Sequence, residues 1–281
     1  MKIKNIMEFK EISGKKVFYF ESEDPVISSL KNGILFGASN FRLLSEFILD
    51  ESGYVLDCGA HIGTFALESS KKYKTICVEA ADKNIQCLNK TFESSDKVEV
   101  RSSILSSGVF KCDFSSDYGP FGSLIQSGEG GKFQTNTLDN IVGEKVVSAI
   151  KLDIEGGEIE ALKGCENILS KQKPPMIVEV NGHCLRLIGK RPEDLFDIID
   201  SFGYNIYLNN NGSMIQINKE KVFPFCVNDV ICLHRDNMDK YKNKIKFARF
   251  LSDNEIFKIL SEGYSNSNSD CQLYFSSLIS K

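Results

Sequence analysis

Short strand-like runs alternate with helical patterns through the middle of the chain, and this alternation constrains the fold more than any other feature. Runs rich in apolar and β-branched residues occupy 54–57, 75–78, 97–101, 149–152 and 176–180. Apolar residues at helical spacing follow the first two runs. Strands that alternate with helices build a mostly parallel sheet with helices on both faces. We therefore expect an α/β fold of this kind.

The last part of the pattern predicts how the sheet ends. Pro192 suits the first turn of a well-patterned helix, and Gly203 stops it. Strand-like runs at 204–208, 214–217 and 229–233 follow. We expect these runs to close the sheet, with an antiparallel strand among them.

The rest of the chain is predicted to add to a core at 51–235. Residues 1–50 contain a hairpin pattern and two helices that we expect to pack on the core. The Gly- and Ser-rich stretch 106–131 predicts an inserted hairpin or loop over one end of the sheet. Residues 236–281 predict a helical extension that starts with a capping box and ends in a polar tail.

The composition excludes several classes of protein. The chain has 281 residues, and its 34 basic and 38 acidic side chains leave a net charge of −4, which gives no reason to expect a nucleic-acid partner. No run approaches the roughly 18 apolar residues that span a bilayer, and the first residues lack the apolar centre of a signal peptide. The 9 cysteines include no Cys-x-x-Cys pair, which favours reduced thiols and a cytoplasmic location. The 3 histidines show no spacing typical of a structural zinc site.

A carboxylate precedes a glycine-containing turn at 54–65. The first strand delivers Asp57 to the carboxyl edge of the sheet. Gly59 and Gly63 allow a tight turn, and we expect them to bring backbone N–H groups close to a ligand where the helix begins. Glu79 follows 22 residues later at the end of the next strand, where a carboxylate can accept hydrogen bonds from both hydroxyls of a ribose.

Two classes of cofactor use this geometry. A dinucleotide site requires the pattern Gly-x-Gly-x-x-Gly, because its pyrophosphate lies directly against the backbone. This turn has only Gly59 and Gly63, and the Asp57 carboxylate would repel a pyrophosphate. S-adenosylmethionine has an amine, a sulfonium and a ribose but no phosphate, so the charge pattern favours it. An NAD(P)-dependent oxidoreductase on a related fold stays the alternative.

Three motifs resemble those of a known family. They are Val-Leu-Asp-Cys-Gly-Ala-His-Ile-Gly at 55–63, Thr-Leu-Asp at 137–139, and Lys-Leu-Asp-Ile-Glu-Gly-Gly-Glu at 151–158 with Leu-Lys-Gly at 162–164. The segment from Glu51 to Arg235 resembles the FkbM family of S-adenosylmethionine-dependent methyltransferases, and the 151–158 block is the most discriminating part. Gly157 replaces the usual alanine, and His61 stands where asparagine is common.

The resemblance implies a Rossmann-like class I methyltransferase fold and an enzyme that methylates hydroxyl oxygens, often on sugars or secondary metabolites. It implies that the turn lines the methionine end of the cofactor, that Glu79 holds the ribose, and that the residues after the third strand flank the adenine. The implied cofactor-binding residues are Asp57, Gly59, Ala60, His61, Gly63, Glu79, Ala80, Ser102, Ser103, Ile104 and Asp153.

A hydroxyl is a poor nucleophile, so transfer to it gains from a base, and three residues are candidates. Asp153 and Glu155 stand where a strand gives way to a helix, although acidic residues are also common at helix starts for electrostatic reasons. Glu158, one helical turn later, fits this electrostatic role at a helix start better than the role of a base. His183, in a predicted loop after the fifth strand, is either a base or an ordinary surface residue. Asp139 is expected to cap a short helix.

The sequence therefore predicts an S-adenosylmethionine-dependent O-methyltransferase. The expected acceptor is a small molecule or glycan that presents a hydroxyl group. A divalent metal could polarise that hydroxyl, but we expect none, because carboxylates at a sheet edge need no metal. The alternatives are the oxidoreductase named above and a non-catalytic protein that only binds the cofactor. The sequence does not predict the oligomeric state.

Overall fold

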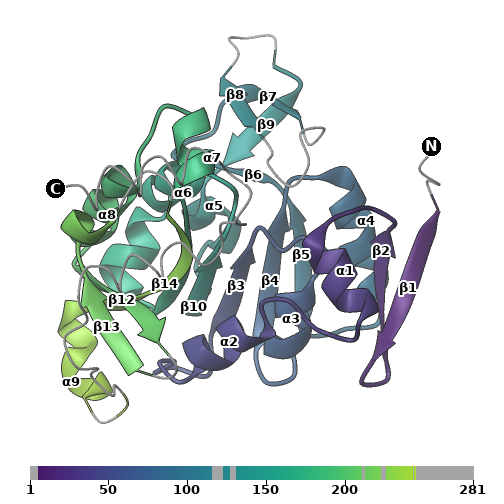
Figure 1. Cartoon of the computed structure of the whole chain (residues 1–281), viewed down its shortest axis with the longest axis horizontal. Helices are drawn as coiled ribbons and strands as arrows, with labels where there is room; N and C mark the ends of the chain where they lie inside the picture. The colour runs from purple at the N-terminus through teal and green to yellow at the C-terminus, as the bar shows by residue number, and fades with distance from the viewer. Residues whose placement is uncertain are drawn as a thin grey trace, which may run out of the picture.

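A computed structural model describes residues 6–115, 123–126, 131–210, 213–222, 226–242 and 244. Within these residues an eight-stranded sheet has the order β13-β12-β14-β11-β10-β3-β4-β5 (Figure 1). Its strands are β3 (Tyr54–Cys58), β4 (Lys74–Glu79), β5 (Val98–Ser102), β10 (Val147–Leu152), β11 (Met176–Asn181), β12 (Tyr204–Asn210), β13 (Ser213–Ile217) and β14 (Val227–His234).

The directions of these strands confirm a mostly parallel sheet. β5, β4, β3, β10 and β11 pair in parallel, in that order. β14 is antiparallel to both β11 and β12, and β13 is antiparallel to β12. Two strands, β13 and β14, thus run against the rest, where the sequence predicted one. The parallel register sets Asp57 of β3 directly beside Lys151 of β10.

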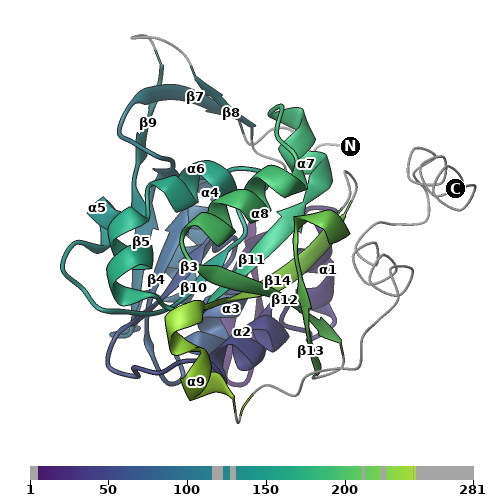
Figure 2. The ribbon, with the colours of Figure 1, turned by 90° about the vertical axis from the view of Figure 1, so that its left-hand side faces the viewer.

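Helices cover both faces of this sheet (Figure 2). One apolar core lies between the sheet and a layer made of α5 (Leu138–Val142), α6 (Glu158–Lys163) and α8 (Pro192–Ser201). The other face packs against α2 (Ala38–Ser45), α3 (Thr64–Ser69) and α4 (Asp82–Thr91). The central strands β3, β10 and β11 are largely buried between the two layers, as parallel strands generally are.

The N-terminal addition packs against the second face. It consists of the hairpin β1 (Met7–Ile12) and β2 (Lys15–Phe20), then α1 (Pro25–Lys31) and α2. The backbone N–H of Phe18 donates to Thr91 Oγ1 of α4 at 3.0 Å. Apolar side chains of β2 and α1 share one buried cluster with α3 and α4. This segment thus contains a hairpin and two helices, and α2 ends at Ser45.

The insertion after β5 forms a second small sheet at the top of Figure 1. Its order is β6-β9-β7-β8, made from β6 (Ile104–Leu105), β7 (Lys111–Ser115), β8 (Ser123–Gln126) and β9 (Phe133–Asn136). The antiparallel pairing of β7 with β8 matches the hairpin, one of the two forms predicted for this insertion. The sequence did not predict β6 or β9. β6 has only 2 residues, and β9 is short and mostly polar.

The remaining described elements come from the second half of the sequence. They are α7 (Gly182–Leu187), the π-helix η1 (Ile168–Gln172), the 3₁₀ turns η2 (Lys219–Lys221) and η3 (Arg235–Asn237), and α9 (Met238–Tyr241). The predicted capping box and polar tail lie outside the described residues. No helix in the described ranges combines the length and apolar character that a membrane crossing needs.

Candidate functional site

The turn after β3 comes very close to the end of β10. Gly59 has a φ of +78°, and a Cβ on it would lie 1.7 Å from the carbonyl oxygen of Asp153. The N–H of Asp153 in turn donates to the carbonyl of Cys58 at 3.1 Å. Only glycine fits such an approach. This contact brings Asp57 and Asp153 to the same edge of the sheet.

A buried lysine connects these two carboxylates. Lys151 Nζ lies 3.3 Å from Asp57 Oδ1 and 3.4 Å from Asp153 Oδ2, and it donates to the carbonyl of Gly59 at 2.8 Å. Burial opposes the charge of Lys151, but the carboxylates of Asp153 and Asp57 outweigh it and hold the lysine pKa above its usual value. The lysine therefore stays charged and fixes the geometry of this edge.

Asp57 is fully buried, with 0% of its surface exposed. Burial raises the pKa of its carboxyl, and the Lys151 ammonium opposes that shift. Among the described residues its Oδ2 has no hydrogen-bond partner. A buried acceptor of this kind is costly unless a donor satisfies it. Asp57 thus keeps capacity for a donor or a cation.

A second group of carboxylates gathers at the ends of β10 and β11. Glu155, in the turn after β10, accepts hydrogen bonds at Oε2 from Asn181 Nδ2 and from Cys184 Sγ, both at 3.1 Å. Ligand atoms of Asp153, Glu155 and Glu179 lie within 4.8 Å of one another. Burial, together with the nearby Asp153, raises the pKa of Glu155 to about 7.

Strand β14 adds a further carboxylate opposite Glu179. Asp229 is the register partner of Glu179 across β11 and β14. Asn40, from α2 of the N-terminal addition, donates to Asp229 Oδ2 at 2.6 Å. Burial and the charge of Asp153 raise the pKa of Asp229 to about 6. Burial, with Asp153 and Glu155 nearby, raises the pKa of Glu179 well above its usual value.

We call Asp57, Asp153, Glu155, Glu179 and Asp229 the carboxylate cluster. Lys151 is paired with two of its members, and the cluster as a whole carries excess negative charge. Such an edge suits a ligand with positive charge or with many hydrogen-bond donors. The three members that converge could also hold a divalent cation, since Ca²⁺ and Mg²⁺ take carboxylate oxygens.

Glu158 supports the cluster from within the protein. It is 0% exposed, and its Oε1 accepts from the N–H groups of Ile154 at 3.0 Å and Gly156 at 3.2 Å. Burial raises the pKa of Glu158 to about 7. Its carboxyl thus holds the turn that carries Glu155, a role that the sequence did not predict.

Glu79 already accepts several hydrogen bonds from the backbone. Its Oε2 accepts from the N–H of His61 at 2.7 Å, and its Oε1 accepts from Ala80 at 2.9 Å and Ala81 at 2.8 Å. A carboxylate has about four acceptor positions, so one position on Oε2 is left for a ribose hydroxyl. The ribose contact stays a prediction.

The predicted adenine residues lie beside Glu79. Ser102 of β5 is its register partner, and the N–H of Ser103 donates to the carbonyl of Glu79 at 2.9 Å. Ile104 begins β6 and is buried. The parallel pairing of β4 and β5 therefore brings the predicted ribose and adenine residues to one edge.

The expectation that the turn offers free N–H groups to a ligand is wrong at several positions. Gly59 and Ala60 both donate to the carbonyl of Val78, at 2.9 and 3.2 Å, and Gly63 donates to the carbonyl of Ala60 at 2.8 Å. Gly63 also makes room for a neighbouring helix, because a Cβ there would lie 2.6 Å from Phe92 Cε2. Few of the N–H groups of this turn are therefore left to bind a pyrophosphate, which argues against a dinucleotide cofactor.

The structure places the two candidate histidines differently. His61 lies in the turn with its Nε2 3.2 Å from Asp24 Oδ2. His183 lies in the first turn of α7 rather than in a loop. Its sequence neighbours Asn181 and Cys184 contact Glu155.

Asp139 does not cap its helix, so that expectation is wrong in detail. Thr137 is the N-cap of α5. Asp139 instead accepts from the N–H groups of Asn167 at 2.8 Å and Ile168 at 3.1 Å. Its role is to tie α5 to the segment before η1.

Sequence reasoning missed several residues of this edge. Lys151 was visible as a charge inside an apolar strand, and a buried charge needs a partner. Glu179 was likewise visible in an apolar run. Asp24, Asn40 and Asp229 gave no local signal, because only the packing of distant segments brings them here.

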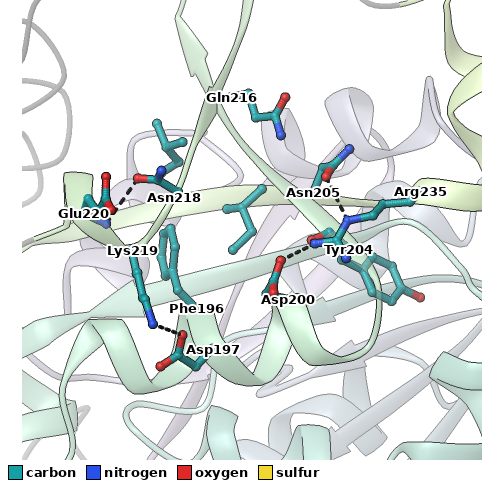
Figure 3. A pocket seen from close by; sticks show the side chains of 12 residues that line it. Phe196, Asp197, Asp200, Tyr204, Asn205, Gln216, Asn218, Lys219, Glu220 and Arg235 are labelled. Carbon is teal, nitrogen blue, oxygen red and sulfur yellow. Dashed lines mark hydrogen bonds and ion pairs between the residues drawn. The ribbon is translucent and has the colours of Figure 1, made fainter.

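A separate cavity of about 290 Å³ lies between α8, β12 and β13 (Figure 3). Four of its charged side chains form pairs: Lys219 binds Asp197 at 2.8 Å, and Arg235 binds Asp200 and also Asn205 at 3.2 Å. None of the predicted site residues lines it. The carboxylate cluster is therefore the better candidate for the functional site.

Several solved structures are similar to this chain. The methyltransferase FkbM from Methylobacillus flagellatus KT has 19% sequence identity and a TM-score of 0.43, over 66% of this chain and 44% of that one. TYW2 of M. jannaschii, in complex with AdoMet, has 13% identity and a TM-score of 0.40, over 81% and 84%. The tRNA (uracil-54, C5)-methyltransferase of Pyrococcus abyssi has 14% identity and a TM-score of 0.38, over 81% and 44%. This chain thus spans less than half the length of the Methylobacillus protein. A search of curated proteins found no match.

The family comparison agrees with the chemistry of the site. The model of the methyltransferase FkbM domain matches residues 57–206. S-adenosylmethionine carries two positive centres and no phosphate, which fits the buried, partly unsatisfied Asp57 and the excess negative charge around it. The match covers more than half of the chain. The chain therefore belongs to the FkbM methyltransferase family.

Proposed function

We propose that this chain is an O-methyltransferase whose acceptor is a hydroxyl group of an uncharged, polyhydroxylated molecule, namely a sugar, a glycan or a secondary metabolite. The observation that carries the proposal is the carboxylate cluster at the ends of β10 and β11. Carboxylates accept hydrogen bonds from hydroxyl groups, and their charge disfavours phosphates. An acceptor rich in hydroxyl groups therefore matches this edge better than an anionic one.

The cofactor is assigned to the turn side of the edge. In this proposal Asp57 faces the amine, and the backbone from Gly59 to Gly63 lines the methionine end. Glu79 uses its remaining acceptor position for the ribose, and Ser102 and Ser103 flank the adenine. When bound, S-adenosylmethionine supplies a methyl group already activated on a sulfonium.

The acceptor is assigned to the β10 and β11 side, with Glu155 as the base. A base works best when its pKa lies near the working pH, and the pKa of Glu155 is about 7. Asn181 and Cys184 hold its carboxylate in one orientation. Asp153, fixed by Lys151 at 3.4 Å, would orient the acceptor hydroxyl beside it. His183 remains a second candidate for the base.

Binding and turnover test the proposal separately. Calorimetric titration should show that S-adenosylhomocysteine binds in the micromolar range and that NADH does not. Release of S-adenosylhomocysteine should then be measured with neutral glycosides and polyphenols, with their phosphorylated forms, and with tRNA. We expect turnover with neutral hydroxyl acceptors only, and no loss of it in EDTA.

Different outcomes contradict different parts of the proposal. Binding of NADH without S-adenosylhomocysteine overturns the cofactor assignment. Methylation of tRNA, or of carbon or nitrogen in the acceptor, overturns the hydroxyl assignment. Cofactor binding with no methyl release to any acceptor favours the non-catalytic alternative.

A further inference from the structure

The N-terminal addition reaches the cofactor turn through a single carboxylate. Asp24 is the N-cap residue of α1, and its Oδ1 accepts from the N–H of Val26 at 2.7 Å. Its other oxygen, Oδ2, lies 3.2 Å from His61 Nε2. One side chain thus caps a helix and holds the imidazole of a residue 37 positions away in the sequence.

His61 needs such a partner because of its backbone. It has a φ of +52°, in the left-handed region that non-glycine residues adopt only when their surroundings hold them there. The N–H of the same residue donates to Glu79 Oε2 at 2.7 Å. The other oxygen of Glu79 accepts from Ala80 and Ala81. His61 therefore links the start of α1, the turn after β3 and the end of β4.

The chemistry of the contact favours a carboxylate at position 24. A carboxylate only accepts, so the imidazole must present a proton on Nε2. The two side chains are 27% and 14% exposed, which shields the contact from water more than at an ordinary surface pair. An amide at position 24 could still cap α1, but it would offer His61 a weaker acceptor.

We propose that Asp24 is a positioning residue for the cofactor: it fixes His61, and through His61 it holds the turn and the Glu79 carboxylate in the geometry that binds adenosine. This inference rests on the proposed cofactor assignment. It gives the N-terminal addition a function at the site, although none of its residues belongs to the family's matched segment, 57–206.

A double-mutant cycle on the full chain tests the proposal. Asp24→Asn keeps an acceptor for Val26 and should weaken S-adenosylhomocysteine binding roughly tenfold, a typical coupling for residues in contact. His61→Asn replaces the imidazole with a side chain that also tolerates the left-handed region. In that background Asp24→Asn should change the affinity less than about twofold, because the partner is already gone.

Controls separate positioning from general stability. Glu21→Gln removes a surface ion pair with Lys31 on the same segment and should leave the affinity unchanged. At saturating cofactor, Asp24→Asn should keep the wild-type kcat, since it raises only the KM for the cofactor. A lower kcat at saturation would overturn the positioning role.

Two further outcomes also overturn the proposal. One is wild-type affinity in Asp24→Asn, and the other is an equal loss in both backgrounds, which would show that Asp24 acts without His61. If the wild-type chain binds no S-adenosylhomocysteine, the cofactor assignment itself fails. Hydrogen exchange then still tests the linkage, because Asp24→Asn should speed exchange at the amides of His61, Ala80 and Ala81. Unchanged exchange there would refute it.

Discussion

The carboxylate of Glu155 lies at the end of β10, with one oxygen bound by Asn181 and Cys184. Its pKa of about 7 means that half of these groups are ionised near neutral pH. A base must be ionised to take a proton, so the rate of methyl transfer should rise with pH up to about 7 and then level off. This profile is expected for kcat with a hydroxyl acceptor.

Glu155→Gln tests that role directly. The amide keeps the size of the side chain but cannot accept the acceptor's proton, so kcat should fall by about 10²–10⁴ and lose its rise with pH. The affinity for S-adenosylhomocysteine should stay within about twofold, because the residue lies on the acceptor side. Glu93→Gln, which changes a surface pair with Lys90, is the matched control. A near-normal kcat in Glu155→Gln would place the base elsewhere.

We expect Lys151 to contribute to the stability of the fold rather than to proton transfer. Its ammonium lies between Asp57 and Asp153, so Lys151→Met leaves two carboxylates without their cation. Removing one partner of a buried pair costs about 3–5 kcal/mol, and we expect a loss of that size in the free energy of unfolding near pH 7. The loss should shrink at lower pH, where the carboxyls become neutral. Urea denaturation of the variant and the wild type near pH 7 and at the lower pH checks this. A loss of stability that does not depend on pH would contradict it.

At the scale of elements, the contact between the β3 turn and β10 sets the geometry of the site. A Cβ on Gly59 would overlap the carbonyl of Asp153 at 1.7 Å, so Gly59→Ala must push the two strand ends apart. Gly143 also has a positive φ, +61°, but nothing lies within 4 Å of a Cβ there. With a ψ of −127° the backbone of Gly143 lies outside the left-handed helical region, so Gly143→Ala should cost about 1–3 kcal/mol through backbone strain alone.

The two glycine variants should differ clearly in function as well. Gly59→Ala should unfold at a much lower urea concentration than Gly143→Ala and should lose S-adenosylhomocysteine binding. Gly143→Ala should bind like the wild type. Equal stability and equal affinity of the two variants would show that the turn and β10 are not in tight contact.

The sequence predicted those parts of this architecture that depend on local pattern. The five parallel strands and the helix from Pro192 follow from runs and spacing within a few residues. That Asp57 and Asp153 belong to one site was implied by the family resemblance, and the pairing of β3 with β10 brings their strand ends to one edge. β9 was missed because Phe-Gln-Thr-Asn at 133–136 has no strong strand pattern.

The contacts that no local pattern encodes could not be predicted. The pair of Glu179 and Asp229 depends on the register of β14 against β11. The contact of Asp24 with His61 depends on where the N-terminal addition packs. The backbone N–H groups of Gly59 and Ala60 donate to the carbonyl of Val78, and this depends on the exact path of the chain. Such facts belong to tertiary packing, which a single sequence does not display.

At the scale of the whole molecule, the carboxylate cluster and Glu158 make stability depend on pH. Burial raises the pKa of Glu155 and Glu158 to about 7 and that of Asp229 to about 6. In the unfolded chain such groups ionise near about pH 4, so between these values the folded state binds more protons. Their contribution to stability is complete below about pH 4 and is lost as the pH rises through 7.

The free energy of unfolding without cofactor should therefore fall between about pH 4 and pH 7, with a slope of up to about 1.4 kcal/mol per pH unit for each proton involved. Glu158→Gln should reduce this slope, since the amide oxygen still accepts from Ile154 and Gly156 but the side chain no longer ionises. Glu93→Gln should leave it unchanged. Urea titrations across this range decide the matter. Stability that stays level or rises between about pH 4 and pH 7 would mean that these carboxyls are ionised without cost, and hence that their charges do not gather in the way that suits a cationic cofactor.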